Sequence, residues 1–196
     1  MMTLETLLKE GTKILKEKEI QDAALDAWLL LEYVTSKSRA YYFAHQEETV
    51  EEEKAVQYRN LIGQRAKHIP LQHLTHQACF MGFEFYVNEN VLIPRQDTEV
   101  LVEKALEILK ERKAPKILDM CTGSGCILLS ILGLKEDARG TGADISEEAL
   151  KVAGRNAAAL KIEEKAQFIE SDLFSHPFFA DHRDCTPILK ARTSAI

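Results

Sequence analysis

The stretch Ile117–Gly125 constrains the fold more than any other part of this sequence. It reads Ile-Leu-Asp-Met-Cys-Thr-Gly-Ser-Gly, an apolar strand that ends in an acid and runs into a loop of small residues, and an apolar helix is predicted directly after it, at 126–134. Glycines at 123 and 125 can adopt torsion angles closed to other residues and let a ligand approach the backbone closely. A helix that begins after such a loop also presents free N–H groups to an anion. The pattern predicts a ligand site between a strand and a helix.

Strands and helices alternate along the second half of the chain. The short apolar run at 116–120 predicts a first strand, and a second and a third strand are predicted at 140–144 and 167–170. Between the last two, Ser146 can cap a helix whose first turn is acidic. Strands that alternate with helices pair in parallel and form a doubly wound sheet. The fold class is therefore α/β with a Rossmann-like sheet, of which the sequence predicts the first three strands only.

The first half of the chain shows a helical pattern in place of alternating strands and helices. Leucines at 4, 7, 8 and 15 follow a helical period, a second helical run covers Ala24–Leu31, and a third covers 51–67, before Pro70 ends the pattern. Aromatic and β-branched residues then predict a short hairpin within 79–91, with a turn signal at Asn88–Asn90. A helix over 97–112 leads into the alternating region.

Acidic residues follow or end each of the three predicted strands: Asp119, Asp144 and Asp172. Such acids suit a ligand with ribose hydroxyls, an adenine amine and a sulfonium, none of which needs a phosphate clamp. A dinucleotide fingerprint would need a third glycine, and Leu128 stands there, which disfavours a nicotinamide-dependent dehydrogenase. The alternative is that each acid only caps a helix or turns a loop.

Three short segments resemble the first motifs of class I methyltransferases: Asp119–Gly125, Gly142–Ser146 and Ser171–Phe174. Upstream, Val91–Val102 reads Val-Leu-Ile-Pro-Arg-Gln-Asp-Thr-Glu-Val-Leu-Val. It is similar to the Leu-Ile-Pro-Arg-Pro-(Asp/Glu)-Thr-Glu signature of the release factor glutamine methyltransferases, with Gln96 where proline is usual. The resemblance extends over roughly 4–174, with His76 where a glycine is usual.

The resemblance implies a cofactor, a partner and a set of site residues. The cofactor is S-adenosylmethionine, and the substrate is the glutamine of a Gly-Gly-Gln loop in a peptide chain release factor. Residues 121–125 would hold the cofactor's amino-acid end, Asp144 its ribose, and Asp172 with Leu173 its adenine. The cofactor-binding residues are thus Asp119, Cys121, Thr122, Gly123, Ser124, Gly125, Asp144, Asp172 and Leu173. Arg95, Thr98 and Glu99 form the motif on the substrate side.

The expected domains follow from the same resemblance. They are a helical release-factor-recognition domain at 1–78, a β-hairpin linker at 79–96, the first half of the methyltransferase domain at 97–174 and an aberrant tail at 175–196. The family positions the amide with an Asn-Pro-Pro-Tyr motif, and no Asn-Pro dipeptide occurs in these 196 residues. We therefore assign no catalytic residue and expect a truncated, inactive chain.

The tail does not read as the expected fourth strand. Pro187–Ile196 can be encoded by a set of codons that gives a different peptide when it is read one base earlier. That peptide is Pro-Tyr-Ile-Lys-Ser-Lys-Asp-Ile-Ser-Asp, and it resembles the residues that come after the family's catalytic motif. The hypothesis is a shifted reading frame, and the gene sequence beyond the codon for Phe174 tests it. Without a fourth strand, 116–120 would be an unpaired, aggregation-prone edge.

Net charge, targeting signals and cysteine spacing indicate which classes of partner and which cellular compartment to expect. A formal net charge of −6 argues against a general nucleic-acid binder, which usually carries a basic face. The start has no signal segment, no apolar run is long enough for a membrane, and the four cysteines form no CxxC pair, so we expect reduced thiols in the cytoplasm. We also expect a monomer.

Competing interpretations remain open at this stage. His73, His76 and Cys79 have a spacing that a metal site could use, although we expect loop residues and a core thiol instead, and no metal. Cys121 and Cys126 flank the glycine loop and are expected to pack. The chain could also methylate another substrate, or bind a release factor without chemistry.

Overall fold

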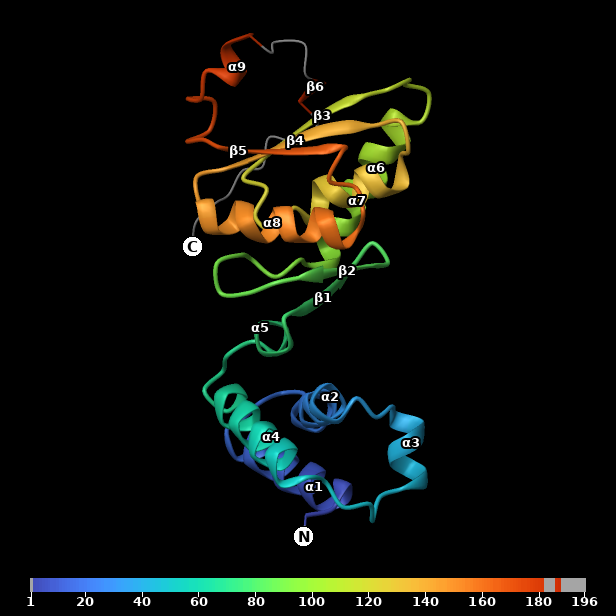
Figure 1. Ribbon diagram of the computed structural model, residues 1–196, viewed down its shortest axis with the longest axis vertical. Helices are drawn as coiled ribbons and strands as arrows, with labels where there is room; N and C mark the ends of the chain where they lie inside the picture. Colours follow the sequence, from blue (N-terminus) through green and yellow to red (C-terminus); the bar gives the residue numbers. More distant parts are fainter. Residues whose placement is uncertain (1, 182–185, 188–196) are drawn as a thin grey trace. The chain divides into compact units, whose positions relative to one another are not determined.

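The computed structural model describes residues 2–181 and 186–187 and divides into two compact units, Met1–Thr75 and His76–Ile196. The first unit is helical (Figure 1). Its helices are α1 (Leu4–Glu17), α2 (Ala23–Thr35), α3 (Arg39–Ala44), α4 (Glu52–Arg65) and α5 (Leu71–Thr75). The third predicted helical run is α4, which ends two residues before its predicted end.

The core of the helical unit comes from the apolar stripes of α1, α2 and α4. Leu7, Leu30 and Ile62 are fully buried there. One glycine makes the close packing possible: a Cβ at Gly11 of α1 would lie 2.1 Å from the hydroxyl of Tyr58 on α4. That hydroxyl donates to the carbonyl of Ala27 at 3.2 Å, so it is fixed in place. Burial raises the pKa of the Tyr58 phenol well above its usual range.

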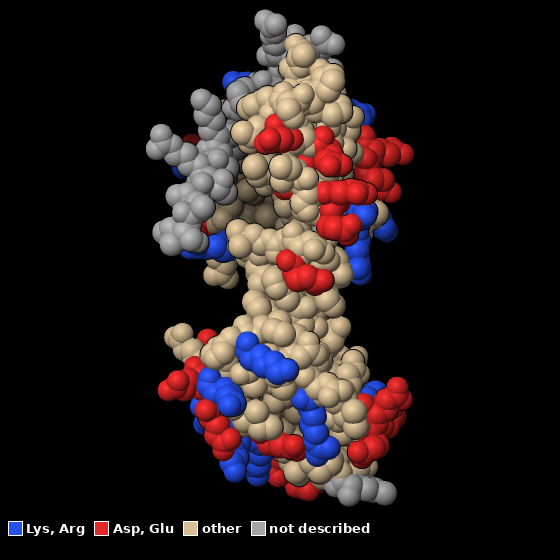
Figure 2. All heavy atoms as spheres, turned by 90° about the vertical axis from the view of Figure 1, so that its left-hand side faces the viewer, with Lys and Arg blue, Asp and Glu red and all other residues tan. Residues whose placement is uncertain are grey.

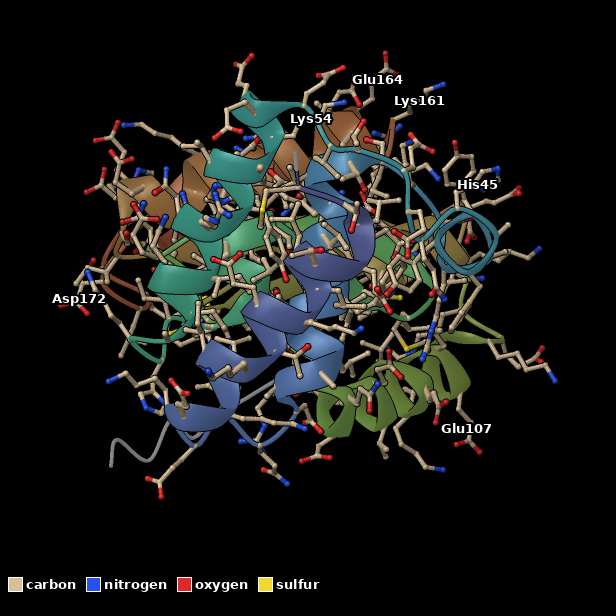
Figure 3. All side chains as sticks on the ribbon, turned by 90° about the horizontal axis from the view of Figure 1, so that it is seen from below. His45, Lys54, Glu107, Lys161, Glu164 and Asp172 are labelled. Atoms are coloured by element: carbon tan, nitrogen blue, oxygen red, sulfur yellow. The ribbon has the colours of Figure 1, made fainter. Side chains whose placement is uncertain are left out.

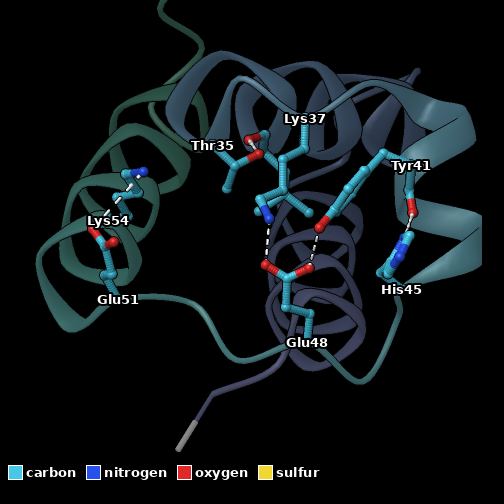
Figure 4. A network of polar contacts seen from close by, with 8 residues as sticks. Thr35, Lys37, Tyr41, His45, Glu48, Glu51 and Lys54 are labelled. Atoms are coloured by element: carbon cyan, nitrogen blue, oxygen red, sulfur yellow. Dashed lines mark hydrogen bonds and ion pairs between the residues drawn. The ribbon is translucent and has the colours of Figure 1, made fainter.

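A short loop fastens the amino end of α1. The carbonyls of Glu48 and Gln46 accept from the N–H groups of Leu4 and Glu5, at 3.0 and 3.1 Å. These N–H groups have no partner inside the helix. Figure 4 shows how the loop is held in turn: the Glu48 carboxylate accepts from the ammonium of Lys37 and, at 2.6 Å, from the hydroxyl of Tyr41.

The second unit begins with a hairpin of β1 (Gln77–Phe80) and β2 (Phe83–Tyr86). The hairpin predicted within 79–91 therefore exists, but its turn is Met81-Gly82 and not Asn88–Asn90. Both turn residues have positive φ, 52° and 78°, as the tight two-residue hairpin turns require. Phe80 and Phe85 point from the hairpin into the apolar core of this unit.

The unit continues as a parallel sheet with three longer helices on one face and a short helix, which contains Phe179, on the other (Figure 1). The strands are β3 (Lys116–Met120), β4 (Arg139–Asp144), β5 (Ala166–Glu170) and the two-residue β6 (Thr186–Pro187), in the order β5-β4-β3-β6. The helices are η1 (Gln96–Thr98), α6 (Glu99–Leu109), α7 (Cys126–Leu134), α8 (Glu147–Ala159) and α9 (Phe178–Asp181). The α/β class and the three predicted parallel strands are confirmed.

One expectation about the sheet edge is wrong. Ile117 and Leu118 pair in parallel with Thr186 and Pro187, so β3 is not an unpaired edge at these residues. The free N–H and C=O groups of an edge strand pair with an extended segment that returns to them, and the chain after α9 does so. The rest of the tail to which the reading-frame hypothesis applies, 182–185 and 188–196, lies outside the described residues.

Replacing Gly11 with alanine is expected to destabilise the helical unit. The added methyl group would also lie 2.9 Å from Ile62 Cδ1, and overpacking of this kind costs about 1 to 3 kcal/mol. Urea unfolding measures the effect. The matched control is Gly63→Ala, where a Cβ meets nothing within 4 Å and helix propensity adds up to about 1 kcal/mol. Equal stabilities of the two variants would contradict the packing account.

Candidate functional site

The carboxyl ends of β3, β4 and β5 meet at the left side of the second unit in Figure 1. Figure 2 views the molecule from this side and shows that the surface of this unit is hollowed there. Ligands of open α/β sheets bind at this edge of the strands. The residues that follow β3, β4 and β5 therefore form the candidate site.

The glycine loop, residues 121–125, leaves β3 through left-handed backbone conformations. Gly123 and Gly125 have φ of 55° and 78°. A Cβ at Gly125 would lie 3.2 Å from the Cβ of Ala153, so this glycine lets the loop pack closely on α8. A Cβ at Gly123 would meet nothing within 4 Å. Gly123 therefore faces open space, where a ligand can reach the backbone.

Hydrogen bonds join the glycine loop to the end of the neighbouring strand. The N–H of Gly123 donates to Oδ2 of Asp144 at 2.9 Å, and Ser146 N–H donates to Oδ1 at 3.1 Å. The N–H of Thr122 donates to the carbonyl of Ala143 at 3.0 Å. Each carboxylate oxygen of Asp144 keeps acceptor capacity beyond its one bond. The structure thus brings the predicted loop and the predicted ribose acid into direct contact.

Asp119 lies beneath the loop and is only 3% exposed. Its carboxylate accepts from the Thr122 hydroxyl at 2.7 Å and from the backbone N–H of Leu128 in the first turn of α7. Burial raises the pKa of Asp119 to about 6, and its two hydrogen bonds offset part of that effect. The protein's own carboxylate therefore occupies the amino end of α7, which a phosphate would otherwise take.

Packing of α7 on the sheet also differs from that of a dinucleotide site. Leu128, at the position of the third glycine, is fully buried. A Cβ at Gly140 of β4 would lie 2.4 Å from Leu128 Cδ1. The small residue that allows helix and strand to approach is thus on the strand and not on the helix.

The two cysteines beside the loop behave differently. Cys126 is buried, as expected, and burial raises the pKa of its thiol to about 11. Cys121 has φ of 61° and is exposed, so the expectation that it packs is wrong. Partial burial, together with the nearby carboxylates of Asp144 and Asp119, raises the pKa of Cys121 as well. Neither thiol is poised to ionise at neutral pH.

The third predicted acid lies apart from the glycine loop. Asp172 is exposed, and Figure 3 shows its side chain pointing outward. It lines an open pocket of about 800 Å³ together with Ile145, which follows Asp144 in the chain. Leu173 has φ of 50° and its carbonyl accepts from the Ser171 hydroxyl at 2.7 Å. Asp172 therefore borders a space that adjoins the end of β4, whereas Leu173 is not among the residues that line it.

The substrate-side motif has local contacts in this structure. Glu99 accepts from the N–H of Met81 at 2.6 Å, which ties the start of α6 to the hairpin turn. Arg95 pairs with Asp97 at 2.9 Å, and both side chains are largely exposed. Thr98 donates its backbone N–H to the carbonyl of Arg95 at 2.9 Å. Glu99 therefore has a structural contact that the sequence motif does not indicate.

Sequence reasoning missed one residue of this site, Asn156 on α8. It is 1% exposed, and its amide contacts the backbone of Ser124 in the glycine loop and of Tyr86 in β2. A signal existed in the sequence. Val152, Ala153 and Ala157 form the buried face of α8, and Asn156 is the one polar residue in that spacing.

No metal site emerges among residues 2–181 and 186–187, where no three histidine, cysteine or acidic side chains lie close enough together to hold an ion. His76 Nδ1 instead lies 3.1 Å from the carbonyl of Val87. Within the same residues, no helix is both long and apolar enough to cross a membrane.

Two family models match the chain. Residues 6–75 match the PrmC N-terminal domain and residues 117–191 match a methyltransferase domain. Three curated relatives bear the name release factor glutamine methyltransferase. They come from Leptospira interrogans (45% identical, 86% of this chain and 60% of the relative), Clostridium acetobutylicum (36%, 90% and 62%) and Chlorobaculum tepidum (37%, 88% and 60%).

The chain spans about three fifths of the length of these relatives. The two domain matches include most of the helical unit and the strands that form the candidate site. The chain is thus similar, over about three fifths of their length, to proteins named release factor glutamine methyltransferase, and it matches both a PrmC N-terminal domain and a methyltransferase domain.

Proposed function

We propose that the second unit binds S-adenosylmethionine at the glycine loop and Asp144, and that the chain serves the methylation of a glutamine in release factors. The hydrogen bond from Gly123 N–H to Asp144, at 2.9 Å, carries the first part of this proposal. It joins the open loop to a carboxylate with spare acceptor capacity. The names of the relatives support the second part.

The residues present fit this cofactor better than a dinucleotide. The open space at Gly123 admits the cofactor's amino-acid end, and the Asp144 oxygens can accept from two ribose hydroxyls. The buried Asp119 carboxylate supplies negative charge toward a cationic ligand and repels a pyrophosphate. Asp172 and Leu173 would border the adenine.

The chemistry of the acceptor explains what else the reaction needs. The cofactor supplies a methyl group on a sulfonium, and an amide nitrogen is a weak nucleophile because its lone pair is delocalised into the carbonyl. Catalysis must come mainly from holding the amide in line with that methyl group. The Asn-Pro-Pro-Tyr motif that does this in the family is not in these 196 residues. We therefore propose that these residues bind the cofactor without turning it over.

The helical unit is proposed to recognise the release factor. Its match to the PrmC N-terminal domain covers 6–75, almost the whole unit. The apolar core of this unit comes from its own helices, and the contacts of Glu48 hold the loop that fastens α1. A pull-down of release factor by the chain, with and without S-adenosylmethionine, tests this part of the proposal.

Calorimetry and a transfer assay test the function directly. Titration with S-adenosylmethionine is expected to give saturable binding, and titration with NADH none. Incubation of the chain and a release factor with radiolabelled cofactor is expected to leave the release factor unlabelled. Binding of NADH but not of S-adenosylmethionine would contradict the cofactor assignment, and clear labelling would contradict the proposed lack of turnover.

Replacing Asp144 with asparagine is expected to weaken S-adenosylmethionine binding by roughly tenfold or more, since a charge-assisted hydrogen bond is worth about 1.5 to 3 kcal/mol. The change removes the charge that accepts from Gly123 and Ser146. Asp22→Asn is the matched control, because Asp22 is exposed and its side chain makes no capping hydrogen bond. Isothermal calorimetry on both variants measures the effect, and an unchanged affinity for Asp144→Asn would refute the ribose assignment.

Asp119→Asn is expected to lower the affinity for S-adenosylmethionine and to raise the free energy of unfolding. The folded pKa of Asp119 lies above its unfolded value, so its ionisation costs stability above pH 6 and the cost disappears below about pH 4. The shift from 3.8 to about 6 corresponds to about 3 kcal/mol. The variant should therefore gain stability over wild type at pH 7, and the gain should vanish near pH 4.

Urea unfolding at several pH values measures this difference, and calorimetry measures the expected loss of S-adenosylmethionine affinity. A stability difference that does not change with pH would show that Asp119 is not held as a costly buried anion.

A further inference from the structure

Asn156 makes three hydrogen bonds from one buried amide, and all three go to backbone groups. Oδ1 accepts from the N–H of Tyr86 at 2.7 Å, and Nδ2 donates to the carbonyl of Tyr86 at 3.0 Å and to the carbonyl of Ser124 at 2.9 Å. Two carbonyls need donors and one N–H needs an acceptor. This demand fixes the orientation of the amide.

The two segments that the amide joins come from distant parts of the sequence. Tyr86 is the last residue of β2, and Ser124 lies between the two glycines of the loop. The side chain next to the amide strengthens the hold on the hairpin, because the Arg155 guanidinium lies 3.4 Å from the centre of the Tyr86 ring. The end of α8 therefore fixes both segments at once.

The glycine loop depends on this contact at Ser124. Thr122 and Gly123 are held by Ala143 and Asp144 on the β4 side. Ser124 is 2% exposed, and Asn156 supplies the donor for its carbonyl from the α8 side. A buried carbonyl without a donor costs free energy, so the loop would shift to regain one if the amide were lost.

We propose that Asn156 is a positioning residue that holds the glycine loop in its cofactor-binding conformation and couples that loop to β2. The inference rests on the proposed binding of S-adenosylmethionine at residues 121–125. Asn156 acts through the Ser124 backbone and not through contact with the ligand. Its loss should therefore weaken binding of the cofactor's amino-acid end and leave binding of the adenosine end unchanged.

Asn156→Asp tests the proposal, because it keeps the side-chain size and the acceptor for Tyr86 N–H but loses both donors, the one to the Ser124 carbonyl and the one to the Tyr86 carbonyl. At about pH 8, calorimetry should show roughly tenfold weaker binding of S-adenosylmethionine, equivalent to the loss of the one hydrogen bond to the glycine loop, and unchanged binding of adenosine. Asn60→Asp, the same substitution on the exposed face of α4, should change neither affinity.

Acidic conditions should partly rescue the variant. Burial raises the pKa of a carboxyl group, and a protonated carboxyl regains one donor. The affinity of Asn156→Asp relative to wild type should therefore recover between about pH 8 and about pH 5.5. Both proteins contain Asp119, so dividing the affinity of the variant by that of wild type cancels the effect of Asp119 titration.

Hydrogen exchange separates this inference from the proposed function. Without any cofactor, the amides of 121–125 should exchange faster in Asn156→Asp than in wild type at about pH 8, while those of α7 stay unchanged. Unaltered loop exchange, or equal loss of S-adenosylmethionine and adenosine binding, would overturn the positioning role. Wild-type protein that binds no S-adenosylmethionine would instead overturn the proposed function, and the exchange result would still decide the role of Asn156.

Discussion

The hydrogen bond between Gly123 N–H and Asp144 is the interaction on which the site depends. It joins the loop after β3 to the end of β4, so the glycine loop and the acid act as one surface. Gly123 can make this bond because its φ of 55° is open to glycine. The bond also orients Asp144, whose other oxygen accepts from Ser146 at the start of α8. A parallel sheet alone would place these residues near each other without fixing them.

The ligand class follows from charge rather than from the outline of the fold. A dinucleotide site and this site share the strand, the loop and the helix. Here, the buried Asp119 accepts from Thr122 and from the first turn of α7, so the positive end of the helix already faces an anion. The buried charge of Asp119 lowers the stability of the fold. Attraction to a cationic ligand offsets this loss, whereas repulsion from a pyrophosphate would add to it.

Local sequence patterns predicted the elements and the residues adjacent to them, and tertiary contacts decided the rest. The glycine spacing and the strand-end acids led to Gly123 and Asp144, which the structure joins. The same reasoning could not find Asn156, whose partners are 70 and 32 residues away in the sequence. The family resemblance assigned Glu99 to the substrate side, and the structure shows in addition that its carboxylate accepts from the N–H of Met81 in the hairpin turn. The β3 edge was expected to be free because two-residue strands such as β6 leave no hydrophobic pattern to detect.

The most direct test of the account is a crystal structure of this chain with S-adenosylhomocysteine, the product form of the proposed cofactor. The account predicts that the ligand's carboxylate and amine lie against residues 121–125 and that its ribose hydroxyls donate to Asp144. A ligand bound elsewhere, or one whose ribose lies away from the end of β4, would contradict it.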